Sequence, residues 1–325
     1  MRNVIYRRIV NNLLFVVDPD RIRAYGVGRP RFVRVGYGLH QQDRKRTAGT
    51  MSIQGVERDI TVATWNLWRR GGPWEQRHKL ITAALEYAAA DVICLQQSWS
   101  TSDRNQPREI AAALGLEHVE VAPYAGPAGP DGGRTLLAVI SRWPLRNVIT
   151  RGLPSALARS QGRGMLGVIV DHPSGPLPVV TTHLNSSPTG SGDRVTEVRA
   201  VAELVGELAG TADADLGPIV TGDLNAEPES DEVRLLGGLL TAPAVPGLGL
   251  EDVWHYADPA GPGHTWRREN SYLAAGTRSA RIDYILVGLA TRVLAARMIG
   301  VDATDGLHPS THAGVCARVV LRPER

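Results

Sequence analysis

From residue 59 onward, apolar residues follow helix-like and strand-like spacings in turn. Residues 75–90 place Leu80, Ile81, Ala84, Leu85 and Ala88 on one helical face, and residues 193–209 repeat that spacing. A shorter helix is predicted over residues 107–114. Short apolar runs bounded by turn residues predict the strands, namely DITVATWNL, DVICLQQ, LLAVIS, GMLGVIVD, LPVVTTHL, GPIVTGDLN, ARIDYILVG and AGVCARVVL.

The order of these elements predicts the fold class. The runs GMLGVIVD and LPVVTTHL are joined by the turn HPSGP and form a hairpin, and helices stand between pairs of strands. Strands of this kind must bury one face against another layer. We therefore expect an α+β fold, a four-layer α/β/β/α sandwich of two mainly antiparallel sheets flanked by helices.

The first 50 residues differ from the rest in charge and pattern. They carry 11 Lys and Arg against three Asp and Glu, a net charge of +8, whereas the other 275 residues carry 25 basic and 30 acidic side chains, a net charge of −5. The segment has no sustained periodicity, and Met51 after it opens a stretch that resembles a protein start. We expect residues 1–50 to be a basic, irregular extension, disordered or not translated, before a domain over residues 51–325. The alternative is a basic arm that binds nucleic acid or anionic lipid.

Cysteine usage and hydropathy add two expectations. Cys94 and Cys316 each lie in an apolar run, which predicts two buried free thiols rather than a disulfide framework or a zinc site. No run reaches the roughly 18 apolar residues of a membrane span. The apolar run 9–17 is short and lacks the small-residue cleavage site of a signal peptide. We expect a cytoplasmic protein and a monomer.

Polar residues that can carry chemistry stand at the ends of the apolar strands. They are Asn66 in TVATWN, Gln97 in VICLQQ, His183 and Asn185 in VVTTHLN, Asp223 and Asn225 in IVTGDLN, Asp283 in RIDYIL, and His312 before the last strand. One such residue is usually a turn former or a polar group bonded to backbone. Six recurrences at strand ends predict instead that the side chains converge on one rim of the sheets, where rigid elements can present a site.

The ordered motifs TWN, LQQ, ISRWP, TTHL, GDLN, RIDY and STH resemble those of the endonuclease/exonuclease/phosphatase superfamily. Pancreatic deoxyribonuclease, apurinic endonucleases, inositol polyphosphate 5-phosphatases and neutral sphingomyelinases belong to it. The resemblance covers residues 58–321, and the segments GHTWRRENSYLA and DGLHPSTHAGV are most similar to its bacterial hydrolase branch. It implies a phosphoric ester hydrolase that uses one or two divalent cations, Mg²⁺ or Mn²⁺, and in-line attack by water.

The same resemblance implies roles for individual residues. Asp223 would orient or deprotonate the attacking water, and Asn225, His183 and His312 would contact the phosphate. Asp283 would hold His312 in place and favour its imidazolium form. Substrate contacts are expected from Asn185 and Arg281, and metal contacts from Asn66, Gln97 and Thr311.

Two positions depart from the family pattern. Gln97 stands where the motif LQE has a metal-binding glutamate, and Thr311 stands where SDH has an aspartate. Because Mg²⁺ favours carboxylate oxygens, we expect reduced metal affinity. The leading hypothesis is a metal-dependent phosphodiesterase or phosphatase of attenuated activity. The alternative is a non-catalytic phosphate-binding protein that retains the fold.

The substrate stays open between nucleic acid, phospholipid and small phosphodiesters. Five tryptophans could stack on bases, although packing is favoured for them: Trp68, Trp74, Trp143, Trp254 and Trp266. Four arginines before the RIDY strand could meet a polyanion or form an ordinary solvated surface: Arg267, Arg268, Arg278 and Arg281. The chain has neither a Walker motif nor a G-x-S-x-G serine, which excludes a nucleotide P-loop and gives no support to a serine hydrolase triad.

Overall fold

The computed structural model describes residues 7–10, 13–16, 59–126, 128, 133–211, 216–257 and 261–322. The chain divides into two units, Met1–Ile53 and Gln54–Arg325. In the first unit, strands β1 (Arg7–Val10) and β2 (Leu13–Val16) pair antiparallel. The expected boundary at Met51 lies outside the described residues.

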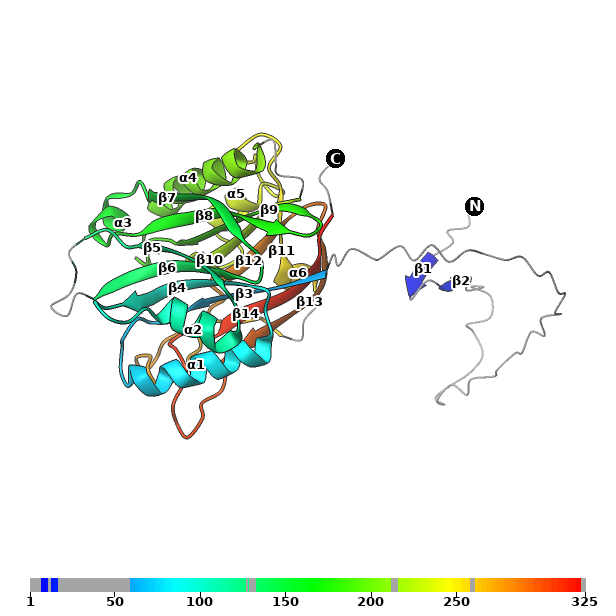
Figure 1. Ribbon diagram of the computed structural model, residues 1–325. Helices are drawn as coiled ribbons and strands as arrows, with labels where there is room; N and C mark the ends of the chain where they lie inside the picture. Colours follow the sequence, from blue (N-terminus) through cyan, green and yellow to red (C-terminus); the bar gives the residue numbers. More distant parts are fainter. Residues whose placement is uncertain are drawn as a thin grey trace, which may run out of the picture. The chain divides into compact units, whose positions relative to one another are not determined.

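The second unit contains two six-stranded sheets (Figure 1). The first sheet has the order β11 (Leu250–Asp252), β12 (Asp283–Gly288), β10 (Ile219–Asp223), β9 (Gly175–His183), β8 (Gly164–His172) and β7 (Leu145–Gly152). The second has the order β13 (Arg292–Ile299), β14 (Gly314–Val320), β3 (Asp59–Asn66), β4 (Val92–Ser100), β6 (Arg134–Ser141) and β5 (His118–Pro123). Neighbouring strands are antiparallel except for the parallel pairs β9–β10 and β3–β4.

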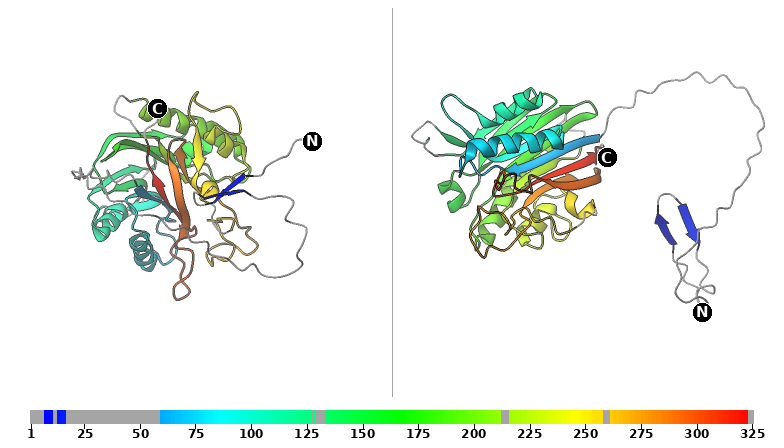
Figure 2. Two further views of the ribbon diagram at one scale, coloured as in Figure 1. Left: turned by 90° about the vertical axis from the view of Figure 1, so that its right-hand side faces the viewer. Right: turned by 90° about the horizontal axis from the view of Figure 1, so that it is seen from below.

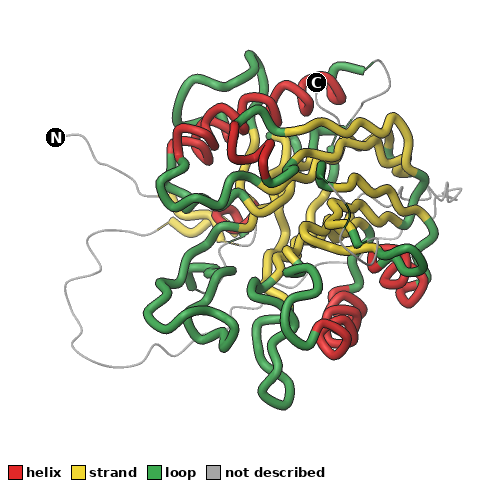
Figure 3. Tube along the Cα trace, turned by 90° about the vertical axis from the view of Figure 1, so that its left-hand side faces the viewer, coloured by secondary structure: helices red, strands yellow, loops and turns green. Residues whose placement is uncertain are grey.

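Helices cover the outer faces of both sheets, as Figures 2 and 3 show. Helices α1 (Trp74–Ala88) and α2 (Gln106–Leu114) pack on the second sheet, and α4 (Ser191–Ala209) and α5 (Asp231–Gly237) pack on the first. Two short helices, α3 (Ala156–Ser160) and α6 (Val253–Tyr256), complete the described elements. None of the helices in the described part of the chain has the length and apolar character to cross a membrane.

Three apolar clusters hold these layers together. One lies between the sheets and includes Ile60 and Val179, and the others lie under α4 and under α1. Cys94 and Cys316 are buried free thiols, as predicted. The predicted four-layer α+β sandwich of two mainly antiparallel sheets is confirmed.

Within the second unit, the strands absent from the prediction are the outer ones. β5, β7, β11 and β13 occupy the four sheet ends, and the long outer strands β7 and β13 are largely exposed or half-buried. A strand at a sheet edge packs on fewer neighbours, so its sequence keeps little of the apolar alternation that marks inner strands.

The register of three inner strands creates the frame of the site. Asp223, the last residue of β10, pairs with His183 at the end of the parallel strand β9. Asp223 also pairs with Asp283 at the start of the antiparallel strand β12. Three polar residues from distant parts of the sequence therefore lie side by side at one edge of the first sheet.

Candidate active site

Asp223 lies at the centre of a buried hydrogen-bond network. Its Oδ2 accepts a hydrogen bond from Asn66 Nδ2 at 2.8 Å and lies 3.2 Å from His183 Nε2. Its Oδ1 accepts the backbone N–H of Asn225 at 3.0 Å. Burial alone would raise the pKa of Asp223, but the positive charges that His183 and His312 carry at the low pH where Asp223 titrates, and the hydrogen bonds from His183 and Asn66, hold it below its ordinary value. The carboxylate is therefore ionised at neutral pH.

The hydrogen bonds of His183 define its tautomer. Burial lowers the pKa of His183 to about 4, so the imidazole is neutral at pH 7. Because the Asp223 carboxylate only accepts, the single ring proton belongs on Nε2. Nδ1 then accepts from the hydroxyl of buried Tyr124 at 2.8 Å. Tyr124 thus holds His183 as a donor to Asp223.

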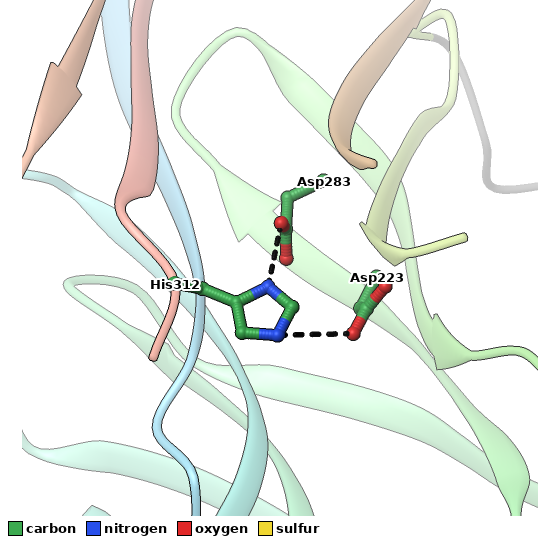
Figure 4. Close-up of side chains that lie close together, drawn as sticks. All are labelled: Asp223, Asp283 and His312. Carbon is green, nitrogen blue, oxygen red and sulfur yellow. Dashed lines mark hydrogen bonds and ion pairs between the residues drawn. The ribbon is translucent and has the colours of Figure 1, made fainter. Parts of the chain in front are cut away.

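His312 and Asp283 form a second pair, shown in Figure 4. His312 Nδ1 donates to Asp283 Oδ2 at 2.9 Å, while Nε2 lies 3.8 Å from Asp223 Oδ2. Burial alone would lower the pKa of His312, but the charges of Asp283 and Asp223 outweigh it and raise the pKa. The distance of 3.8 Å is too long for a hydrogen bond. The Nε2–H therefore remains able to donate to an oxygen placed between His312 and Asp223.

These residues border a cavity of about 430 Å³. It is lined by Asn66, Trp68, Arg69, Gln97, Tyr124, Gln161, Arg163, His183, Ser186, Asp223, Asn225, Trp266, Thr311 and His312. Asp283 stands behind His312, and Trp266 packs edge-on against the His312 ring at 4.9 Å between centroids. The structure thus brings together eight of the ten residues expected from the sequence, all except Asn185 and Arg281.

Asn185 and Arg281 lie elsewhere. Asn185 is fully buried, and its side chain donates to Asp193 and accepts the N–H of Ser187. Arg281 forms an ion pair with Asp252 at 2.6 Å and lines a different cavity. Neither residue lines the cavity around Asp223.

The side chains expected to hold a metal offer only neutral oxygens. Asn66 uses its amide nitrogen on Asp223 and its oxygen on the Trp68 N–H. Gln97 lies at a bulge of β4 with a left-handed φ of 51°, and Thr311 is buried beside His312. Mg²⁺ usually takes at least one carboxylate from the protein. The three residues therefore do not fit a tightly held divalent cation.

A second group has the residue types of a metal site. The ligand atoms of Asp223, Asp283 and His312 lie within 4.8 Å of one another. However, His312 Nδ1 already donates to Asp283, and the raised pKa of His312 favours an imidazolium, which repels a cation. The geometry fits a general base beside a His–Asp pair better than a set of metal ligands.

Five residues that line the cavity were not found from the sequence: Arg69, Tyr124, Gln161, Arg163 and Ser186. Tyr124 follows β5 and Arg163 precedes β8, both in loops without a motif. Arg69 comes three residues after Asn66 of the TWN motif, which was its only signal. Of the five tryptophans considered for base stacking, only Trp68 and Trp266 line the cavity.

A family model and several solved structures match the chain. The model of the Endonuclease/Exonuclease/phosphatase family matches residues 63–305. No curated protein sequence matches the chain.

Several solved structures share the fold. An endonuclease/exonuclease/phosphatase from Beutenbergia cavernae is 23% identical with a TM-score of 0.62, over 81% of this chain and 72% of that one. The human Nocturnin catalytic domain with bound sulfate is 18% identical with a TM-score of 0.64, over 82% and 95%. TDP2 from D. rerio, complexed with a single-strand DNA product, is 18% identical with a TM-score of 0.62, over 80% and 98%.

The family match spans more than half of the chain, and it includes Asn66, His183, Asp223 and Asp283. The chain belongs to the endonuclease/exonuclease/phosphatase family.

Proposed function

We propose that the protein hydrolyses phosphate esters, phosphodiesters in particular, by in-line attack of a water molecule held by Asp223. The observation that carries the proposal is the ionised Asp223 carboxylate, which is buried in a network of donors and lines the cavity beside His312. A carboxylate in this state can orient water and accept its proton. A phosphodiester substrate is also consistent with one structural relative, D. rerio TDP2, which is described in complex with a single-strand DNA product.

The remaining side chains have distinct parts in the proposed reaction. His312 donates through Nε2 to a phosphate oxygen, and Asp283 positions its ring. Neutral His183 donates to Asp223 and so supports the ionised carboxylate. The Asn225 side-chain amide donates one N–H to the Leu184 carbonyl at 3.0 Å. Its second N–H can donate to the phosphate. Water attack then needs no covalent intermediate with the protein.

Family members generally use a divalent cation, which neutralises phosphate charge when bound. An ion at Asn66, Gln97 and Thr311 would have neutral protein ligands only, so the expected Mg²⁺ or Mn²⁺ would bind with reduced affinity. The attenuated activity, the substrate class, the cytoplasmic location and the monomeric state stay predictions. A panel of DNA, RNA, phospholipid, inositol phosphate and small phosphodiesters, run at a stated salt concentration, would separate the substrate classes.

We expect the substitution Asp223→Asn to lower hydrolysis of bis-p-nitrophenyl phosphate by at least about 100-fold, because an amide cannot accept the water proton. Initial rates should be measured with and without Mg²⁺ or Mn²⁺. The matched control is Asp302→Asn, which changes an exposed carboxylate outside the cavity. Thermal unfolding of both variants shows that the fold is retained.

The rival function is phosphate binding without catalysis. It would be supported if the wild-type protein bound phosphate but hydrolysed no substrate of the panel faster than the Asp223→Asn variant. The same result would defeat the proposed hydrolase.

A further inference from the structure

The cavity around Asp223 is rich in positive charge. Among the described residues that line it, Asp223 is the only carboxylate, whereas Arg69 and Arg163 both line it together with His312. The two positions where the family motif has carboxylates, Gln97 and Thr311, face the same cavity. A divalent cation and two arginines compete for the same kind of anionic ligand. With carboxylates absent at Gln97 and Thr311 and two arginines present, the cavity is better suited to hold a phosphate by arginine than by a metal ion.

Arg163 is a buried cation without an ion pair among the described residues. It is 7% exposed, and its guanidinium donates to the Leu184 carbonyl and to Ser186 Oγ. Burial lowers the pKa of Arg163, with Tyr124 and Asp223 opposing it, but a guanidinium stays charged at neutral pH. The N–H groups without a protein partner are available to the cavity. A buried charge of this kind is stabilised by an anionic ligand.

Arg69 is fixed at its backbone and free at its head. Its N–H donates to the carbonyl of Gln97 at 2.8 Å, and its own carbonyl accepts from the buried side chain of Arg77 at 2.8 Å. Arg69 and Trp68 both have left-handed φ angles, 46° and 56°. Such strained backbone persists only where its surroundings enforce it, and it concentrates at functional sites.

In contrast to its fixed backbone, the guanidinium group of Arg69 has no partner among the described residues. The side chain is exposed at the cavity and has no hydrogen bond or ion pair within the described part of the chain. Its backbone bond to Gln97 places this arginine directly beside the position of the missing glutamate. Two guanidinium groups thus face the cavity from opposite sheets, one after β3 and one before β8.

We propose that Arg69 and Arg163 bind the non-bridging oxygens of the substrate phosphate and supply the positive charge that a divalent cation provides in relatives. Phosphate binding then needs no metal. The inference rests on the proposed function, because it assigns the phosphate end of the same site. Planar guanidinium groups suit this role, since each can donate two parallel hydrogen bonds to phosphate oxygens.

The test is calorimetric binding of inorganic phosphate to the full chain in excess EDTA. Wild-type protein should bind one phosphate, and Arg69→Gln should weaken binding about ten- to hundredfold, as expected for a lost charged hydrogen bond. Arg163→Lys, which keeps the charge and loses the planar fork, should weaken it less. The matched control is Arg199→Gln, which changes an exposed arginine of α4 and should leave binding unchanged.

The double substitution Gln97→Glu with Thr311→Asp sharpens the test. The added carboxylates should pair with Arg69, lower phosphate affinity in EDTA, and make binding respond to Mg²⁺. Equal affinity of this variant and the wild type in EDTA would count against Arg69. The proposal is overturned if wild-type protein binds phosphate only with Mg²⁺, or if Arg69→Gln binds as tightly as wild type.

Hydrolysis measured on the same samples separates the two ideas. Metal-free phosphate binding that depends on Arg69, combined with no turnover of any substrate, supports the arginine site and removes the hydrolase. Turnover that requires Mg²⁺, combined with no phosphate binding in EDTA, supports the hydrolase and removes the arginine site.

Discussion

At the scale of single residues, the site depends on how buried polar groups set each other's protonation. His183 and His312 both approach Asp223 Oδ2, yet the pKa of His183 is lowered to about 4 and that of His312 is raised. Burial lowers the pKa of both rings, but at His312 the Asp283 and Asp223 carboxylates outweigh it, whereas at His183 the charge of Arg163 adds to it. Two imidazoles beside one carboxylate therefore differ in how readily they are protonated, and so in how they can serve the site.

The carboxylate of Asp283 should control the pKa of His312. His312 is faced by Asp283 and Asp223, with neutral His183 nearby, so Asp283→Asn should lower the pKa of His312. The protonated form that donates to phosphate is lost as pH rises through this pKa, so the alkaline limb of the pH–rate profile should move to lower pH. NMR titration of the His312 ring measures the shift directly. An unchanged His312 pKa in the variant would show that Asp283 has a structural role only.

At the scale of elements, the parallel pair β9–β10 brings Asp223 to His183, and a glycine makes their close approach possible. Gly222 has a φ of 146°, and a Cβ there would lie 2.1 Å from the Thr182 carbonyl oxygen of β9. The glycine of the GDLN motif is therefore required by the sheet itself. The polar residues beside it reach the site because this backbone can pass so close to its neighbour.

Replacing this glycine should affect stability and activity together. We expect Gly222→Ala to lower the free energy of unfolding by about 1–3 kcal/mol, because the backbone is strained for any side chain and must move from β9. Hydrolysis should fall as Asp223 shifts from His183. Urea unfolding of the variant should be compared with Gly192→Ala in α4, where a Cβ meets nothing within 4 Å. Equal stability of Gly222→Ala and wild type would contradict this account.

At the scale of the whole molecule, charge and site are separated along the chain. The net +8 lies in residues 1–50, whereas residues 51–325 carry −5 and include the described residues that line the cavity. Within the unit Gln54–Arg325, most arginines of the cluster before β12 are paired with carboxylates, such as Arg278 with Glu227 and Arg281 with Asp252. By net charge, we therefore predict that non-specific attraction to polyanions comes mainly from the first 50 residues.

Removal of residues 1–50 tests this division. The shortened chain should hydrolyse bis-p-nitrophenyl phosphate at the wild-type rate and unfold at the same temperature, because the cavity and the clusters of apolar residues lie in the second unit. If the segment is a basic arm, affinity for duplex DNA at low salt should fall, and the slope of affinity against salt should decrease. A lower hydrolysis rate would show that the segment contributes to the site.

The sequence by itself determined the layers, the family and most of the candidate site. Apolar periodicity is a local property, so it marks inner strands such as β10 and helices such as α4, while the edge strands β7 and β13 gain too little burial to show it. The strand-end residues Asn66, Asp223 and His312 were readable because their motifs are contiguous in sequence. Their convergence could be predicted because the ends of these strands were expected to lie at one rim of the sheets.

The tertiary structure alone decided which residues meet. Tyr124 and Arg163 come from loops whose sequence has no signal, and they reach His183 and the cavity only through packing of the two sheets. Asn185 and Arg281 looked equivalent to their neighbours in sequence, but nearby acidic side chains engage both of them. Long-range proximity sets burial, pKa and the partner of every charge, and none of these is encoded in a local pattern. Only the three-dimensional structure shows that Arg69 and Arg163 line the same cavity as Gln97 and Thr311, the two positions where the family motif has carboxylates.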